Sequence, residues 1–366
     1  ITITPLETAN AVLSATWAGE LLANHAEITV LLPDIVTKGI ENVNANDFWT
    51  IFNVRGEGIL VANIDTGVRL THEALASKYA CSLAGPHTNC WYDPDGTLSS
   101  PSDGNGHGTH TMGTMIGSDP DNEHQIGMAP NARWIACQGC DTAGCESVDL
   151  LACADWILAP GSLPENRPHV VNNSWGDKTD GSYFYQAQIT VWRASGIFPA
   201  FSAGNNGPSC DSLGDPGSLQ EAFASAAHDT TYELEYSIGS RGPSFYGHEP
   251  YTKPNISAPG VDVTSSYSTT DIAYATMHGT SMASPHSAGA VALLWSCNPS
   301  LVGYVDTTFQ LLQSSARTSR SSTCGVPPDS EGNYSFGYGY LDVLEAGYNV
   351  CDGALTGLVE GYVYDS

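Results

Sequence analysis

Basic side chains are scarce in this sequence. Its 366 residues include 12 lysines and arginines against 39 aspartates and glutamates, which gives a formal net charge of −27 at pH 7. Proteins that bind nucleic acid or an anionic membrane surface neutralise phosphate groups with clusters of lysine and arginine, so this shortage argues against both kinds of partner. The acidic excess agrees with solubility, an acidic or salty habitat, calcium binding or attraction to basic substrates, and composition does not decide among them.

Long apolar runs are also missing. The longest candidate, residues 288–295, is far shorter than the roughly 18–20 residues that a membrane-spanning helix needs, so we expect no membrane span. Two catalytic motifs are absent as well. The sequence lacks the G-x-S-x-G elbow of esterases and lipases of the α/β-hydrolase class. The pairs His72-Glu73 and His248-Glu249 lack the second histidine of the zinc-protease motif H-E-x-x-H.

Cysteine, by contrast, is abundant, and ten cysteines in one chain indicate an oxidising, extracellular location. Cys81 and Cys90 flank a turn-rich stretch and are predicted to close a small loop. Four others lie close together in the sequence: Cys137, Cys140, Cys145 and Cys153. Four thiolates could bind zinc, but the last two are not spaced as a second C-x-x-C pair, so disulfides are favoured. The remaining pairings cannot be deduced from spacing alone.

Strand-like and helix-like segments alternate between residues 40 and 350. Strands are predicted at residues 59–64, 133–137, 170–173 and 197–202, and helices at residues 107–116, 147–158, 183–195, 281–295 and 306–314. This alternation predicts an α/β fold with a mostly parallel sheet and helices on both faces. Ligands of such sheets bind beyond the carboxyl ends of the strands, where Asp65, Ser174 and residues 203–205 are expected.

Three short segments carry the chemistry. Asp65 lies in V-A-N-I-D-T-G-V, His107 in G-N-G-H-G-T-H and Ser281 in G-T-S-M-A-S-P-H. A serine hydroxyl becomes a good nucleophile when a histidine accepts its proton. The histidine in turn needs a carboxylate that fixes its tautomer and stabilises its charged form. The order Asp, His, Ser is that of subtilisin, and all three segments resemble subtilisin-like serine proteases, the subtilases.

This resemblance assigns a role to each of the three residues. Ser281 would be the nucleophile at the start of a helix whose N–H groups and dipole favour an oxyanion, although a serine there could also serve only as an N-cap. His107 would act as general base and then as general acid. Asp65, buried at a strand end, would hold His107. Pro285 is expected in the first turn of the same helix, where proline is tolerated.

A further segment, F-S-A-G-N-N-G at residues 201–207, resembles the part of subtilases that holds the oxyanion-hole asparagine. The match implies that Asn205 donates to the oxyanion, with Asn206, one residue later, as the competing candidate. Ala203 and Gly204 would belong to the substrate-binding wall.

The segment V-N-N-S-W-G at residues 171–176 resembles the stretch that pairs with the substrate backbone as an added strand and lines the pocket for the residue before the cleaved bond. The matching positions are Ser174, Trp175 and Gly176. Trp175 could equally be a core residue.

The resemblance covers roughly residues 39–350 and implies a three-layer subtilisin-like fold. Residues 125–130, 156–160 and 173–176 look most like the bacillopeptidase F branch. The family implies a secreted, monomeric serine endopeptidase that cleaves protein and peptide substrates through an acyl-enzyme. It needs no cofactor for catalysis, and structural calcium is frequent, although no ligand loop can be assigned here. The alternative is an inactive binding protein with the same fold.

The two ends of the chain differ from the middle. Residues 6–24 favour a helix and residues 27–32 a strand, which resembles the end of a subtilase propeptide, whereas the stretch from residue 39 resembles a mature start. We therefore expect a propeptide-like remnant or N-terminal extension at 1–38 and a catalytic domain at 39–350. Residues 351–366 would be a tail or the first strand of an accessory β domain. A propeptide remnant would bring residues 34–38 near Ser281.

A secreted chain is open to N-glycosylation, and three N-x-S/T patterns occur, at Asn172, Asn255 and Asn333. Asn172 and Asn255 fall inside structural segments. Only Asn333 is expected to be exposed enough to carry a glycan.

Overall fold

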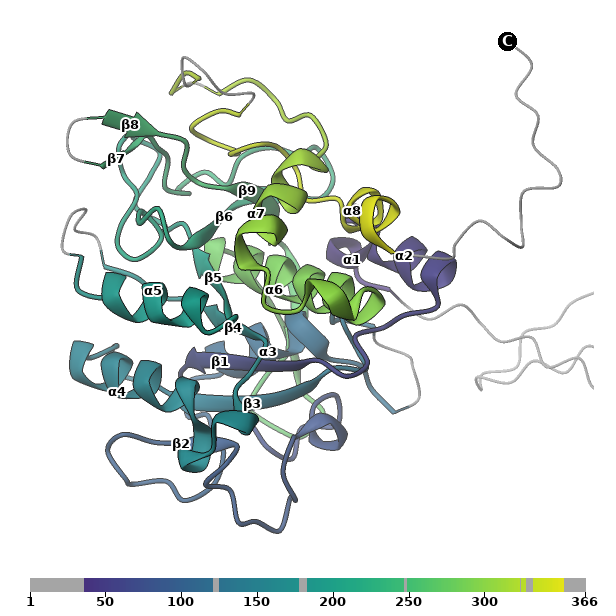
Figure 1. Cartoon of the computed structure of the whole chain (residues 1–366), viewed down its shortest axis with the longest axis vertical. Coiled ribbons are helices and arrows are strands. Elements are labelled where there is room, and N and C mark those ends of the chain that lie inside the picture. Colours follow the sequence, from purple (N-terminus) through teal and green to yellow (C-terminus); the bar gives the residue numbers. More distant parts are fainter. Residues whose placement is uncertain are drawn as a thin grey trace, which may run out of the picture.

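A parallel sheet forms the centre of the protein (Figure 1). The structure, a computed structural model, describes residues 36–120, 125–177, 183–246, 249–322, 324–326 and 332–351. Within these residues seven strands pair in the order β2-β3-β1-β4-β5-β6-β9, every pair being parallel. In that order the strands are Trp91–Tyr92, Arg133–Gln138, Leu60–Asp65, Val170–Asn173, Phe198–Ser202, Phe223–Asp229 and Ile256–Val261.

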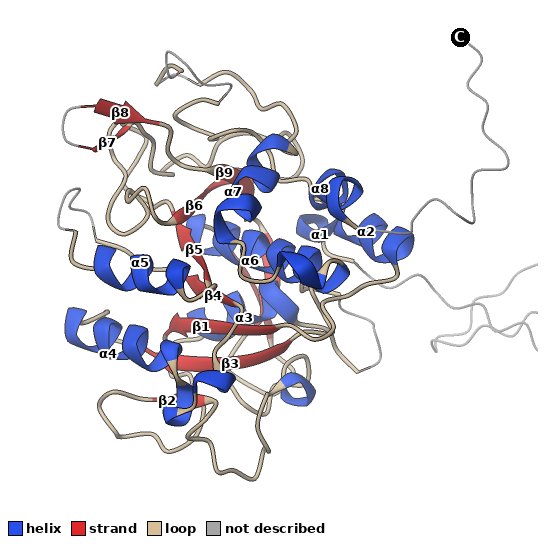
Figure 2. Ribbon diagram, in the orientation of Figure 1, coloured by secondary structure: helices blue, strands red, loops and turns tan. Residues whose placement is uncertain are grey.

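Helices cover both faces of this sheet (Figure 2). Helices α3 (His107–Ile116) and α6 (Thr280–Cys297) contact each other and one face, whereas α4 (Ser147–Leu158) and α5 (Gln186–Ala194) cover the other. The predicted three-layer α/β fold is confirmed. The other helices are α1 (Lys38–Asn42), α2 (Ala45–Phe52), α7 (Val305–Ser314) and α8 (Val343–Val350), and the short hairpins are β7 (Ser244–Tyr246) with β8 (Glu249–Tyr251) and β10 (Val263–Ser266) with β11 (Tyr274–Met277).

Predicted and observed elements agree best where the sequence pattern is periodic. The bounds of α3, α4 and β4 coincide with the predicted ones, and α5 is three residues shorter at its start. Three strands of this sheet, β2, β6 and β9, were not predicted. After Phe223, strand β6 consists of small and polar residues that are nearly all buried, so it shows no alternation. Strand β9 contains Pro259 and Gly260, which are tolerated because β9 lies at the edge of the sheet.

The arrangement of strands positions the functional segments. Strands β1, β4 and β5 are neighbours, and each is almost wholly buried. Because they run in the same direction, their carboxyl ends meet at one edge. Asp65 ends β1, Ser174 follows β4, and residues 203–205 follow β5. The predicted gathering of these segments at one edge is confirmed.

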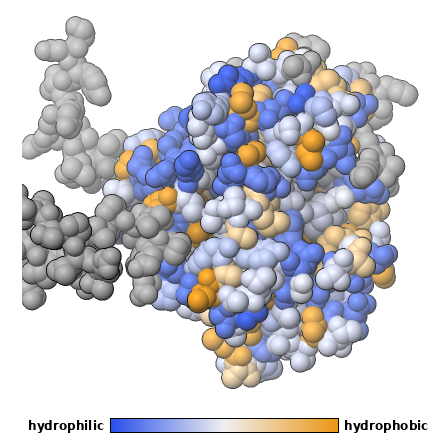
Figure 3. All heavy atoms as spheres, turned by 180° about the vertical axis from the view of Figure 1, so that it is seen from behind, coloured by the Kyte–Doolittle hydropathy of each residue, from blue (hydrophilic) through white to orange (hydrophobic). Residues whose placement is uncertain are grey.

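Polar side chains cover most of the face seen in Figure 3, and hydrophobic ones are scattered singly or in small groups. Scattered apolar residues of this kind are ordinary for a protein surface. No helix among the described residues is both long enough and apolar enough to cross a membrane.

All ten cysteines lie in the described part of the chain and form five disulfides: Cys81–Cys90, Cys137–Cys153, Cys140–Cys145, Cys210–Cys324 and Cys297–Cys351. The predicted disulfides, including the small loop closed by Cys81 and Cys90, are confirmed. The cluster considered as a zinc site divides into two disulfides, so it retains no thiolate for a metal.

The glycan prediction was wrong. Asn333 is only 7% exposed, and its Nδ2 donates to the Ser319 hydroxyl at 2.9 Å, while its Oδ1 accepts from the backbone nitrogens of Ser335 and Phe336. The side chain is occupied in holding its own turn. Asn172 and Asn255 are buried as well, so none of the three asparagines presents an accessible amide.

The terminal segments lie mostly outside the described residues, and the division into 1–38, 39–350 and 351–366 stays a prediction. Of the expected remnant, residues 36–38 are described. Val36 bridges to Gln125, and the backbone nitrogen of Thr37 donates to the Gln125 carbonyl at 3.1 Å. Helix α1 begins at Lys38, and Gly39 is buried against the imidazole of His286.

We expect the protein to take up no alkylating reagent in denaturant without a reductant, because all ten cysteines are paired. After reduction, ten adducts should form. Intact-mass measurement checks both values. Four adducts in the unreduced protein, together with stoichiometric zinc before unfolding, would contradict the disulfides of the 137–153 cluster.

Candidate active site

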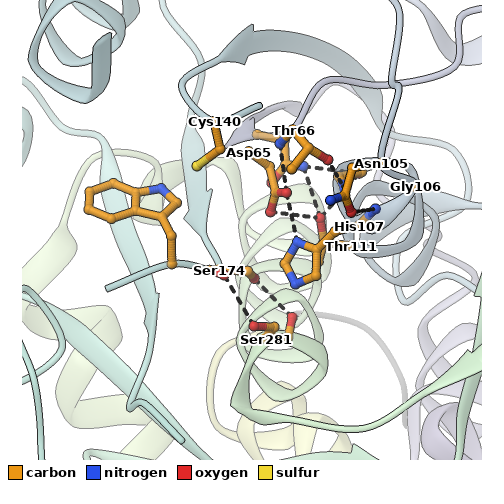
Figure 4. Close-up of polar contacts among 12 residues, drawn as sticks. Asp65, Thr66, Asn105, Gly106, His107, Thr111, Cys140, Ser174 and Ser281 are labelled. Atoms are coloured by element: carbon orange, nitrogen blue, oxygen red, sulfur yellow. Dashed lines mark hydrogen bonds and ion pairs between the residues drawn. The ribbon is translucent and has the colours of Figure 1, made fainter. Parts of the chain in front are cut away.

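A short hydrogen bond to a buried carboxylate joins the first two predicted residues (Figure 4). Asp65 is 2% exposed, and its Oδ1 accepts hydrogen bonds from His107 Nδ1 and from the backbone nitrogen of Thr66, each at 2.7 Å. A buried carboxylate needs such partners because it has left water. Since Nδ1 faces the carboxylate, the neutral imidazole carries its proton there, and Nε2 is left as an acceptor.

The surroundings of His107 change its acidity. Burial of the ring lowers its pKa, but the charge and hydrogen bond of Asp65 and the charge of Asp103 outweigh burial, so the pKa is raised above the usual 6.5. The imidazolium is therefore stabilised, as a general base requires after it has accepted a proton.

Ser281 lies in the first turn of α6, and its contacts differ from those of a resting triad. Among the described residues, its hydroxyl donates to the carbonyl oxygen of Ser174 at 3.1 Å and not to the ring of His107 (Figure 4). In the figure the ring of His107 lies between Asp65 and Ser281. Catalytic hydrogen bonds are often long or misaligned in free enzymes and tighten when substrate binds.

Pro285 lies in the second turn of α6, so its predicted place in the first turn was wrong. A proline there has no N–H for the carbonyl four residues earlier, that of Ser281. The hydroxyl of Ser174 takes over, because it donates to the Ser281 carbonyl at 2.9 Å. The helix therefore continues through Pro285 while Ser174 supplies the missing donor.

Asn205 is fixed by the turn before α6. Its Oδ1 accepts from the backbone nitrogen and the hydroxyl of Thr280, each at 3.1 Å, which leaves Nδ2 to donate elsewhere. A Cβ placed on Gly279 would lie 3.6 Å from both Nδ2 and Oδ1 of Asn205 and 3.7 Å from the backbone nitrogen of Ser281. Two donors thus flank the same small space. Asn206, the competing candidate, also lines the cavity, and its backbone nitrogen donates to the Ser240 hydroxyl.

A cavity of about 570 Å³ surrounds these groups. Its lining includes all four predicted catalytic residues, Asp65, His107, Asn205 and Ser281. It also includes four of the five predicted substrate-binding residues, namely Ser174, Trp175, Gly176 and Gly204. The fifth, Ala203, is fully buried behind this wall, and its backbone nitrogen donates to Ser225. Residues 36–38 do not line the cavity, and residues 34 and 35 lie outside the described chain.

Trp175 lies both in the core and in the wall of the cavity. Its side chain is 7% exposed and makes edge-on contacts with the rings of Tyr185 and Phe201, so it belongs to the core. It also forms part of the cavity wall. Leu150 and the Cys140–Cys145 disulfide also contribute to the lining.

Asp103 was not predicted to take part in the site. Its Oδ1 accepts from the backbone nitrogens of Asn105 and Gly106 and from the Thr66 hydroxyl, and its Oδ2 from the backbone and hydroxyl of Thr109. It therefore shapes the loop that delivers His107. The signal in the sequence was D-G-N-G, a composition typical of side-chain-capped turns.

A metal site does not emerge. Among the described residues, no group of three or more histidine, cysteine, aspartate or glutamate side chains is arranged to hold an ion. The expectation of structural calcium therefore has no assigned site.

Comparison with known proteins gives the family. Residues 56–340 match the subtilase family. Bacillopeptidase F of Bacillus subtilis (strain 168) is 38% identical over 357 residues, which are 92% of this chain and 24% of that protein. Subtilisin of Bacillus sp. (strain TA39) is 33% identical over 67% of this chain and 58% of its own length. Subtilisin DY of Bacillus licheniformis is 31% identical over 68% of this chain and 80% of its own.

We expect the pKa of His107 to lie above 6.5 and to fall in Asp65→Asn, because the neutral amide removes the charge that opposes burial. NMR titration of the histidine ring signals, assigned with a His107→Gln variant, measures both values. A pKa below 6.5 in the wild type, or one unchanged by Asp65→Asn, would contradict the described pairing.

Proposed function

This chain belongs to the subtilase family, and we propose that it is a secreted serine endopeptidase that hydrolyses peptide bonds through Asp65, His107 and Ser281. The observation that carries the proposal is the convergence of the Asp65–His107 pair and Ser281 on one cavity. The chain spans about a quarter of bacillopeptidase F, so the activity of a longer protein is part of the proposal.

In the proposed reaction, a peptide substrate pairs with the chain at Ser174 to Gly176 and brings its carbonyl carbon to Ser281. The serine hydroxyl leaves the Ser174 carbonyl and gives its proton to Nε2 of His107 while Oγ attacks the substrate. The charge of Asp65 stabilises the imidazolium. His107 then protonates the leaving amine, and the acyl group remains on Ser281. A water molecule, deprotonated by His107, hydrolyses this acyl-enzyme and restores the free serine.

The developing oxyanion would lie between Asn205 Nδ2 and the backbone nitrogen of Ser281. Both donors flank one space beside Gly279, and the N–H groups of a first helical turn have no partner inside the helix. The dipole of α6 adds a favourable field for negative charge at this point. Donors fixed before the reaction stabilise the transition state without reorganising.

The proposal requires no cofactor, since every step uses groups of this chain. Protein and peptide substrates are the proposed partners, and a monomer and a role for the chain's own propeptide remain proposals. Secretion is supported by five disulfides, because disulfides persist in oxidising compartments.

Ser281→Ala should abolish peptidase activity and leave the fold intact, because the change removes one hydroxyl from the cavity wall. The measurements are peptide hydrolysis, thermal unfolding and covalent labelling with a serine-directed fluorophosphonate. The wild type should be labelled and the variant should not. An unlabelled, well-folded wild type would instead favour the alternative, an inactive binding protein of this fold, and unimpaired turnover in the variant would exclude Ser281 as the nucleophile.

Asn205→Ala should lower kcat by about 10²–10³ with little effect on KM, since the amide would contact the oxyanion only in the transition state. The magnitude is taken from the loss known for the corresponding asparagine of subtilisin. Steady-state kinetics of Asn205→Ala beside Asn206→Ala measures the effect. A change confined to KM, or an equal loss in both variants, would assign Asn205 to substrate binding or to the turn.

A further inference from the structure

Two buried asparagines lie in neighbouring strands of the sheet. Asn63 in β1 is 1% exposed and Asn172 in β4 is fully buried. Burying an amide is costly unless its polar atoms are bonded. The two side chains meet directly, because Asn172 Nδ2 donates to Asn63 Oδ1 at 2.9 Å. Apolar residues would fill such positions at no polar cost, so the fold alone does not call for asparagine here.

On one side the pair reaches the nucleophile. The second N–H of Asn172 donates to Ser174 Oγ at 3.0 Å, and Ser174 Oγ donates to the Ser281 carbonyl at 2.9 Å. This is the carbonyl that Pro285 leaves without a helical donor. The Ser284 hydroxyl, one turn along α6, donates to Asn172 Oδ1 at 2.7 Å. Asn172 is thus bonded to the start of α6 through two serines.

On the other side the pair reaches the helix that begins with His107. Asn63 Nδ2 donates to the Gly108 carbonyl at 3.1 Å and to Thr111 Oγ1 at 2.9 Å. The Thr111 hydroxyl lies 3.4 Å from Asp65 Oδ2 and 3.1 Å from the Gly108 carbonyl. Both oxygens lie within reach of the Thr111 proton, so Thr111 places the bonded end of Asn63 directly beside the Asp65 carboxylate.

The protons of this chain of hydrogen bonds can be assigned one by one. Each asparagine uses both of its N–H groups as donors and its oxygen as an acceptor. Ser174 Oγ accepts one bond and donates one. A flipped amide would place two oxygens or two N–H groups face to face. A buried network in which every group is satisfied is rigid and specifies one arrangement.

We propose that Asn63 and Asn172 are positioning residues: their chain of hydrogen bonds sets the place of Ser281 relative to His107 and Asp65. The inference rests on the proposed protease function. The three catalytic side chains come from separate elements, β1, α3 and α6, and the two asparagines connect all three across adjacent strands. A misplacement of about 1 Å between reacting groups can cost about 100-fold in rate.

The test replaces each asparagine by valine, as Asn63→Val and Asn172→Val, with Asn173→Val as the matched control. Asn173 is the next residue of β4 and is equally buried, but its Nδ2 donates to the Ala200 carbonyl at 3.2 Å, outside the chain of hydrogen bonds. All three variants remove a buried amide. They differ in whether that amide connects the catalytic elements.

We expect Asn63→Val and Asn172→Val to lower kcat about 10- to 100-fold, with KM changed less than twofold. Active sites are counted by fluorophosphonate titration, and thermal unfolding of each variant is recorded. Asn173 Oδ1 accepts no hydrogen bond from the described residues, so Asn173→Val should lower the unfolding temperature by no more than the other two variants and keep wild-type kcat. Thr111→Val preserves the shape of the side chain and tests the part of the hydrogen-bond chain that reaches Asp65. It serves if either asparagine variant fails to fold, and it should also lower kcat.

The inference would be overturned if the asparagine variants kept the wild-type kcat per titrated site. If those variants fail to fold, a wild-type kcat in Thr111→Val would overturn it. An equal loss of kcat in Asn173→Val would do so too, because it would reduce the effect to general destabilisation. Both outcomes presuppose an enzyme that reacts with the fluorophosphonate. A wild type that does not react would refute the proposed function instead.

Discussion

The charge of Asp65 is the constraint on which the site depends. The carboxylate lies at the end of a buried strand, so its stability requires donors on every side. The backbone of Thr66 and the ring of His107 supply two, both at 2.7 Å. To bring that ring to the strand, α3 must begin directly beside β1. The close approach requires glycine at position 108, because a Cβ there would lie 2.1 Å from the Gly67 carbonyl oxygen. Gly108 is thus a consequence of where the carboxylate lies.

Ser281, the proposed nucleophile, is held by a second arrangement with the same logic. Helix α6 is buried along nearly all its length, so its polar groups need partners within the protein. Pro285 removes one helical hydrogen bond near the N-terminus, and Ser174 restores it from the neighbouring strand segment. Ser174 and Ser281 each donate a hydroxyl proton to the other's carbonyl. The wall that would bind substrate and the residue that would attack it are therefore bonded to each other, and a shift in one moves the other.

The sequence allowed the grouping of Asp65, His107 and Ser281 at one site to be predicted, because the proposed chemistry restricts residue type. Asp65, His107 and Ser281 stand among small residues that few other roles require, and periodic apolar patterns placed α3, α4 and β4 correctly. The prediction failed where contacts between residues far apart in the sequence determine the structure. Strands β6 and β9 are recognisable only from their place in the sheet. The burial of Asn333 cannot be deduced from the residues next to it in the sequence. Asn63 and Asn172 did carry a signal, since each is a polar residue inside a strand expected to be buried, but their partners become visible only when β1 and β4 are side by side.

The five disulfides act on different parts of this framework because they close loops of very different length. Cys297–Cys351 and Cys210–Cys324 join residues 54 and 114 positions apart, and cross-links over long loops restrict the unfolded chain most, typically by about 2–5 kcal/mol. The first ties the end of α6 to the residue after α8, so it secures the helix that carries Ser281 at the end opposite the site. Cys140–Cys145 spans five positions and restricts the unfolded chain least. It lies in the cavity wall, where its effect is on shape: it holds the loop after β3 beside Leu150 and fixes one side of the space that faces His107. The two long-loop disulfides thus contribute mainly to stability, whereas Cys140–Cys145 contributes mainly to the shape of the cavity.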